Sequence, residues 1–296
     1  MQAAQPFIIK TIILTVLALF AFAANSVLCR YALMDGSLDA ASFTEVRLLS
    51  GVVVLLAIVA FRYRKKTIPA NARGSWFAAL MLFCYASSFS YGYLAVEAGM
   101  GTLVLFGAVQ ITMILLSLYS GQTLHNTEWL GVVIAFSGLV YLVFPEDDAS
   151  TLSGLLLMII AGMSWAVYSI KGKSSHYALL DTSYNFSRTI PFIALLGLFT
   201  FQHAHYSYTG IMLAIISGSV TSAIGYAIWY TALTGLTSAQ AAVVQLLVPV
   251  LAGFGGVVFL SEVLSQRLII ASLLILGGIF VVILGRHYLA PLKVKS

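Results

Sequence analysis

The chain has 296 residues, of which 60% are hydrophobic and only 8% are charged. A water-soluble domain carries about 25% charged residues, so this composition excludes a soluble globule. Apolar runs of about 20 residues recur along the chain, and a β-barrel would instead show alternating segments of about ten, so the expected fold class is an all-α polytopic membrane protein. The net charge of +5 does not indicate a nucleic-acid partner, because the basic residues gather beside the apolar runs.

Ten transmembrane helices are predicted, five before the acidic segment 145–151 and five after it. The first run imitates a signal peptide, with Lys10 before it and an A-x-A motif at 21–23. Its apolar character continues to Leu28, so we expect it to be retained. The spans are expected at about 11–30, 43–61, 76–96, 102–120, 129–144, 152–171, 184–202, 210–231, 239–260 and 268–285.

Lysine and arginine residues set the expected orientation. With a cytoplasmic N-terminus, eleven of the fifteen basic residues fall in cytoplasmic positions, and the cluster at 62–66 is the strongest. We therefore expect both termini to be cytoplasmic, in a multi-pass protein of a bacterial-type inner membrane.

This orientation predicts a labelling pattern. A cysteine introduced at Asp147 is expected to react with an impermeant maleimide added outside intact cells, because the acidic segment lies on the outer side. A cysteine at Lys65 is expected to be protected. The reverse pattern would contradict the orientation and the inverted repeat that depends on it.

The two halves resemble each other in sequence. Arg30 and Lys171 are separated by the same number of residues as Arg47 and Arg188. Because each half has five expected spans, an odd number, the second half must enter the bilayer from the opposite face. We therefore predict two inverted five-helix repeats, at 11–144 and 152–285, an arrangement that in transporters places the substrate site near the midplane.

Two segments in each half carry a family resemblance. Residues 22–33 and 43–51, with Arg47, resemble the first-to-second helix signature of the ten-helix EamA branch of the drug/metabolite transporter superfamily. Residues 165–171 and 184–188 repeat it more loosely. The resemblance implies a permease for small metabolites such as amino acids, and an exporter rather than an importer.

Polar and aromatic side chains inside the spans are the candidate substrate-binding residues, because a polar group in lipid needs a partner or a wet cavity. Amide, hydroxyl and aromatic groups together suit a small amphipathic solute. Serines can instead bond their own backbone, and tyrosines can anchor at the interface. The candidates are Asn25, Tyr85, Ser88, Gln110, Trp165, Tyr168, Tyr226, Trp229 and Gln245.

Charged residues near span ends are the candidate gates, namely Arg47, Arg188 and Glu262. We expect Arg47 and Glu262 to lie near the outer ends of the second and ninth spans and to pair when the outer side closes. Arg188 is expected toward the cytoplasm. No Asp, Glu or His falls at mid-depth in an expected span, so proton coupling through a buried carboxylate is not indicated.

An intramembrane enzyme and a gated channel are the alternatives. The chain has no H-E-x-x-H or G-x-S-x-G motif, and Cys29 and Cys84 have no metal-site spacing, so no catalytic residue, cofactor or metal is expected. The expected partners are a small-molecule substrate and the lipid bilayer. The substrate's identity, the coupling ion and the oligomeric state are left open.

Overall fold

The computed structural model describes residues 4–64, 68–69, 72–119, 121, 126–143, 149–173, 175, 177–236, 241 and 244–284. Within these ranges the chain forms helices and no strand, apart from an isolated bridge between Leu38 and Tyr206. In chain order the helices are α1 (Ala4–Met34), α2 (Ala40–Arg62), α3 (Trp76–Gly92), α4 (Ala98–Tyr119), α5 (Asn126–Val143), α6 (Ala149–Lys173), α7 (Ala178–Ser187), α8 (Ile190–Thr200), the short 3-10 helix η1 (Phe201–His203), α9 (Tyr208–Ile216), the π-helix η2 (Ser217–Ile224), α10 (Gly225–Leu233), α12 (Leu247–Leu260) and α13 (Gln266–Leu284).

The all-helical class is confirmed over the part of the chain that the structure describes. Five helices are long and apolar enough to cross a membrane, at Ile9–Met34, Ala40–Arg62, Ala98–Leu116, Ala149–Gly172 and Tyr208–Leu233. Helices overlap the remaining expected spans, but the count of ten crossings stays a prediction. The acidic segment at 144–148 and most of 237–243 lie outside the described residues.

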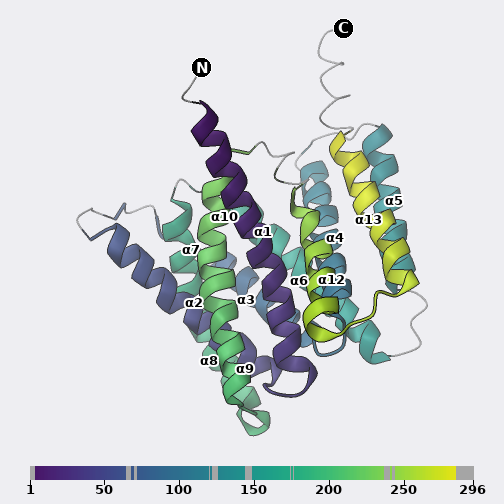
Figure 1. Ribbon diagram of the computed structural model, residues 1–296. Helices are drawn as coiled ribbons and strands as arrows, with labels where there is room; N and C mark the ends of the chain where they lie inside the picture. The colour runs from purple at the N-terminus through teal and green to yellow at the C-terminus, as the bar shows by residue number, and fades with distance from the viewer. Residues whose placement is uncertain are drawn as a thin grey trace.

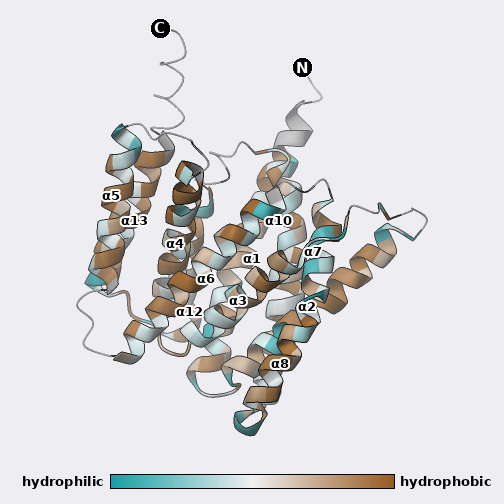
Figure 2. Cartoon of the chain, turned by 180° about the vertical axis from the view of Figure 1, so that it is seen from behind, coloured by the Kyte–Doolittle hydropathy of each residue, from teal (hydrophilic) through white to brown (hydrophobic). Residues whose placement is uncertain are grey.

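The outer surface of the bundle is apolar, as a lipid-facing surface must be. Figure 2 shows hydrophobic residues along the outward faces of α2, α5, α8 and α13. Phe61, Phe199 and Leu273 are largely exposed there, although each would be costly to expose to water. The start of α1 and the end of α13 lie at the same end of the bundle (Figure 1), and which compartment that end faces stays a prediction.

The seventh expected span is not one continuous helix. α7 ends at Ser187 and α8 begins at Ile190, with Arg188 and Thr189 between them. Pro191 lies in the first turn of α8, where its missing N–H has no intrahelical partner to lose. The proline therefore explains the break, and the expected range 184–202 is wrong as a single helix.

The eighth expected span widens in its middle into η2. A side chain at Gly218 would collide with the Arg47 carbonyl and with Ser50, so the backbones of η2 and α2 touch at this glycine. The π-helix also turns the hydroxyls of Thr221 and Ser222 toward α1 and α2, where they make hydrogen bonds. Such local widenings are frequent at functional sites.

The helices pack in a reciprocal pattern. α1 packs on α10 and α12, while α6 packs on α3 and α4. If the halves are exchanged, α1 corresponds to α6, α3 to the span of α9 to α10, and α4 to α12, so the first pair of contacts maps onto the second. An inverted repeat would give this pattern, although the repeat itself stays a prediction.

α5 and α13 form a pair at one side of the bundle, visible at the edge of Figure 1. Glycines allow their backbones to meet. A Cβ on Gly278 would lie 2.5 Å from the Ala135 nitrogen, and one on Gly131 would lie 2.5 Å from the Gly278 carbonyl oxygen. Small residues at helix crossings are how helices approach closely in lipid.

Candidate functional site

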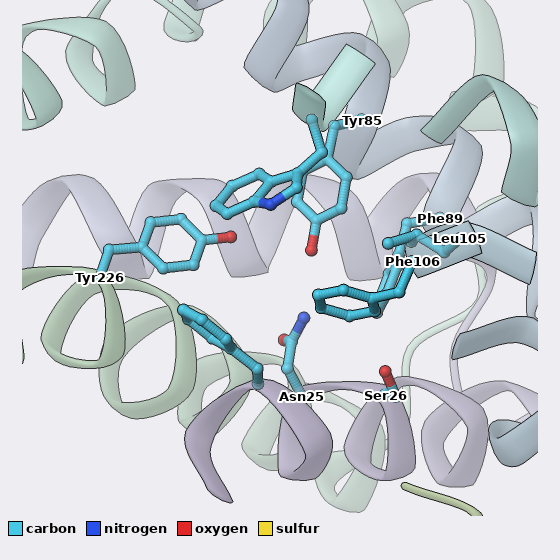
Figure 3. A pocket seen from close by; sticks show the side chains of 9 residues that line it. Asn25, Ser26, Tyr85, Phe89, Leu105, Phe106 and Tyr226 are labelled. Atoms are coloured by element: carbon cyan, nitrogen blue, oxygen red, sulfur yellow. The ribbon is translucent and has the colours of Figure 1, made fainter. Parts of the chain in front are cut away.

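An interior pocket lies where helices of both halves meet (Figure 3). Its cavity volume is about 20 Å³, which is room for about one water molecule. Helices α1, α3 and α4 of the first half and α6 and α10 of the second contribute the walls. The lining residues are Phe22, Asn25, Ser26, Tyr85, Phe89, Leu105, Phe106, Trp165 and Tyr226.

Aromatic rings close the pocket by packing on one another. The ring centroid of Trp165 lies 4.9 Å from that of Tyr85 and 4.9 Å from that of Tyr226. Phe22 packs edge-on against Tyr226 at 5.9 Å and against Trp229 at 5.7 Å. These are favourable aromatic geometries, so the rings hold the closed shape without a ligand between them.

Asn25 supplies an amide group at the base of the pocket. Its carbonyl oxygen accepts hydrogen bonds from Ser217 at 2.7 Å and Thr221 at 3.2 Å, both on η2. Its amide nitrogen, at the other end of the group, points into the pocket (Figure 3). The second half thus fixes the orientation of a polar side chain that the first half supplies.

Arg47 lies buried among helices and not exposed at a helix end, where the sequence places it. It is 1% exposed and donates from Nε to Ser222 and from Nη2 to the Tyr85 hydroxyl, each at 3.2 Å. Its guanidinium carbon is 4.8 Å from the ring centroid of Phe89. The guanidinium therefore sits directly behind the pocket wall that Tyr85 and Phe89 form.

Glu262 joins the two halves at the end of the bundle opposite the start of α1. Its carboxylate lies 3.5 Å from Arg30 Nε and accepts a hydrogen bond from the Ala98 backbone nitrogen at 3.0 Å. The pKa of the Glu262 carboxyl is raised, because burial raises it more than the Ala98 hydrogen bond and the Arg30 charge lower it. The predicted Arg47–Glu262 pair is thus wrong for this conformation, and Arg30 takes the place of Arg47.

Local backbone geometry explains where Glu262 points. Ser261 ends α12 in the left-handed region, with φ of 56°, so the chain reverses and folds the next residue over the last turn. Gly256 leaves room for the Glu262 carboxylate against the helix. The carboxylate then meets the Ala98 N–H at the start of α4, where the backbone N–H groups have no intrahelical partner and attract an anion.

Hydrogen bonds join the halves at the other end as well. Asp181 accepts from the Gly74 backbone nitrogen at 2.8 Å, and Asn185 accepts from that of Ser75 at 2.9 Å. Arg188 donates to the Arg73 carbonyl oxygen, and its guanidinium carbon lies 5.6 Å from the Trp76 ring centroid. The pocket is therefore enclosed between two sets of contacts, one at each end of the bundle.

The family follows from the comparisons with known proteins. The model of the EamA-like transporter family matches residues 9–144 and 152–284, nearly the whole chain. The chain belongs to the EamA-like transporter family. This finding confirms the resemblance that the helix signatures indicate.

Several known proteins are similar to this transporter along most of their length. An uncharacterized protein of Pseudomonas aeruginosa is 44% identical over 277 residues, which cover 94% of this chain and 96% of that protein. An Escherichia coli protein named "Probable amino-acid metabolite efflux pump" is 26% identical, over 83% of this chain and 87% of its own. A solved structure titled only "Crystal structure of protein" has a TM-score of 0.61 at 17% identity and covers 96% of this chain and 98% of its own, which shows a shared fold.

The transporter's pocket brings together four of the nine predicted binding residues: Asn25, Tyr85, Trp165 and Tyr226. Tyr168 and Trp229 lie one layer behind them, against Trp165 and Phe22. Ser88, Gln110 and Gln245 are not in the pocket wall, and Gln245 donates to the carbonyl oxygen of Ala241, four residues earlier in the chain. A substrate role for all nine stays a prediction.

Five further residues of this EamA-like transporter line the pocket that sequence reasoning did not select, namely Phe22, Ser26, Phe89, Leu105 and Phe106. Helical spacing offered a signal. Phe22 precedes Asn25 by three residues and Phe89 follows Tyr85 by four, so each shares a helix face with a selected residue, and Ser26 follows Phe22 by four. Phe, Leu and Ser in an apolar helix otherwise resemble ordinary packing residues.

Proposed function

We propose that the protein is an inner-membrane exporter of amino acids or related small amphipathic metabolites, and that it works by alternating access around the pocket. The observation that carries this proposal is the position of the pocket between two contact sets that each join the halves, Glu262 with Arg30 at one end and Asp181 with Gly74 at the other. Opening one set while the other holds exposes the pocket to one side of the membrane at a time.

The chemistry of the walls supports a small solute with both polar and apolar parts. Trp165, Phe22 and Phe106 offer ring surface, while Asn25 and the tyrosine hydroxyls offer hydrogen bonds. Binding sites for small molecules commonly combine a mostly apolar wall with a few placed polar groups. The efflux-pump name of the Escherichia coli relative supports both the solute class and the direction.

Transport by the purified protein in liposomes tests the proposal. We expect saturable flux of at least one member of a panel of radiolabelled amino acids, accelerated when unlabelled solute is present on the opposite side. Trp165→Ala is expected to lower that flux about 10-fold or more, because it removes the ring shared by most wall contacts. Trp129→Ala, at an exposed tryptophan of α5, is the matched control and is expected to leave flux unchanged.

The alternatives give different results in the same experiment. Flux that does not saturate and shows no counterflow would indicate a channel. Chemical conversion of a solute without flux would indicate an enzyme. Equal losses in Trp165→Ala and Trp129→Ala would contradict the assignment of the pocket as the substrate site.

A further inference from the structure

A positive charge without a negative partner lies directly behind the pocket wall. Arg47 is 1% exposed, and no carboxylate of the described residues lies within the 4.0 Å of an ion pair. Its Nη1 atom makes no hydrogen bond. The rings of Tyr85 and Phe89 compensate part of the charge, but a buried cation is favourable only when an anion or a full set of acceptors surrounds it.

Hydrogen-bond donors gather in the pocket in front of this charge. The Tyr85 hydroxyl accepts from Arg47, so its own proton is available to the pocket. The buried Tyr226 hydroxyl has no hydrogen-bond partner among the described residues. Figure 3 shows both hydroxyls and the amide nitrogen of Asn25 pointing toward one space, while the Asn25 oxygen is held by Ser217.

Aromatic walls of this kind could also hold an ammonium group, but the charges here oppose it. No aspartate or glutamate lines the pocket, and the guanidinium of Arg47 lies behind two of its rings. An ammonium would meet a like charge, whereas a carboxylate would meet three donors and a counter-charge. The anion is therefore the group that this wall selects.

We propose that the pocket recognises the carboxylate group of its solute, which Tyr85, Tyr226 and Asn25 bind through hydrogen bonds while Arg47 supplies the counter-charge. For its biological meaning the proposal rests on the transport function proposed above. The rest of the solute packs against Trp165 and the other rings. Arg47 acts on the carboxylate through Tyr85 in the closed shape and directly once the rings separate.

Only one such site exists in the described part of the bundle. Arg188, the counterpart of Arg47 in the second half, lies at the end of the bundle on the Arg73 carbonyl oxygen and over Trp76. The two arginines thus occupy equivalent sequence positions but different environments. Arg188 therefore offers a matched control for the charge of Arg47.

A pair of probes that differ only in the anionic group tests the proposal. We compare binding of 4-methylpentanoate and 4-methylpentanamide to the detergent-solubilised protein by quenching of tryptophan fluorescence. The wild type is expected to bind the acid about 10- to 100-fold more tightly than the amide, as hydrogen bonds to a charged group allow. Arg47→Gln is expected to reduce this acid-to-amide affinity ratio to about one. Arg47→Lys is expected to retain part of the preference for the acid, and Arg188→Gln is expected to leave the ratio unchanged.

Variants of the hydroxyls cover the case in which Arg47→Gln does not fold. Tyr85→Phe and Tyr226→Phe keep the rings and are each expected to reduce the acid-to-amide ratio about 3- to 10-fold. A wild-type ratio near one, or a ratio that survives in Arg47→Gln or in both tyrosine variants, overturns the proposal.

Flux of amino acids and of their primary amides separates this proposal from the transport function. Acid-selective binding without flux of any solute would support the carboxylate site and contradict the proposed transport function. Equal flux of the acids and their amides would support the transport function and contradict the carboxylate site.

Discussion

Gly278→Leu is expected to lower the free energy of unfolding by about 3 kcal/mol or more, while Gly277→Leu is expected to leave it nearly unchanged. A side chain at Gly278 would meet backbone atoms of Gly131 and Ala135, which cannot move aside as a flexible side chain can. A Cβ at Gly277 would have no atom within 4 Å, and this residue faces outward. The two adjacent glycines therefore test whether α5 and α13 pack as described.

Thermal melting of detergent-solubilised protein, followed by size-exclusion chromatography, measures the difference. Both variants add the same side chain to the same helix, so changes in helix propensity and hydrophobicity cancel between them. Equal melting temperatures for Gly277→Leu and Gly278→Leu would contradict the close contact of α5 and α13.

Glu262→Ala is expected to shift the resting protein about 10- to 100-fold toward the conformation open at the Glu262 end. The change leaves Arg30 without its ion-pair partner and the Ala98 N–H without its acceptor. Each unsatisfied buried donor costs about 1–3 kcal/mol, and about 1.4 kcal/mol is a factor of ten in a population. When this end of the bundle opens, water can hydrogen-bond to the Arg30 guanidinium and the Ala98 N–H, so the cost falls mainly on the closed conformation.

Labelling of a pocket cysteine measures the shift. Ser26→Cys, in a background with Cys29 and Cys84 replaced by alanine, is treated with an impermeant maleimide in vesicles of either orientation. Glu262→Ala should speed labelling from one side, and Asp181→Ala should speed it from the other. Faster labelling from the same side in both variants would exclude these contacts as opposing gates.

Much of the fold could be predicted because membrane solvation acts on composition directly. A run of about 20 apolar residues has few stable structures other than a spanning helix. The break at Arg188 was equally visible in principle, because Pro191 favours the first turn of a helix and kinks or breaks a helix interior. Pairing of small residues such as Gly131 and Gly278 was not, because it depends on which helices meet.

The site was predicted only in part, because side-chain depth depends on neighbours from distant helices. Arg47 lies on the second turn of α2, from where its side chain could extend to the membrane interface or turn inward. It turns inward because its guanidinium donates a hydrogen bond to Tyr85 and packs over the ring of Phe89, both on α3. Glu262 depends on the left-handed conformation of Ser261, which nothing in its sequence context announces. Opposite charge therefore suggested that Arg47 and Glu262 pair with each other, whereas Arg47 bonds to Ser222 and Tyr85 and Glu262 pairs with Arg30.

The mutual packing of the pocket rings has a kinetic and physiological consequence. A solute that enters must part Trp165 from Tyr85 and Tyr226, and each aromatic contact is worth about 0.5–1.5 kcal/mol. Losing two of them weakens affinity by about 5- to 150-fold relative to a preformed cavity. For the proposed exporter, weak affinity suits the role of an overflow valve, which stays idle at ordinary metabolite levels and discharges its cargo only after that cargo has accumulated.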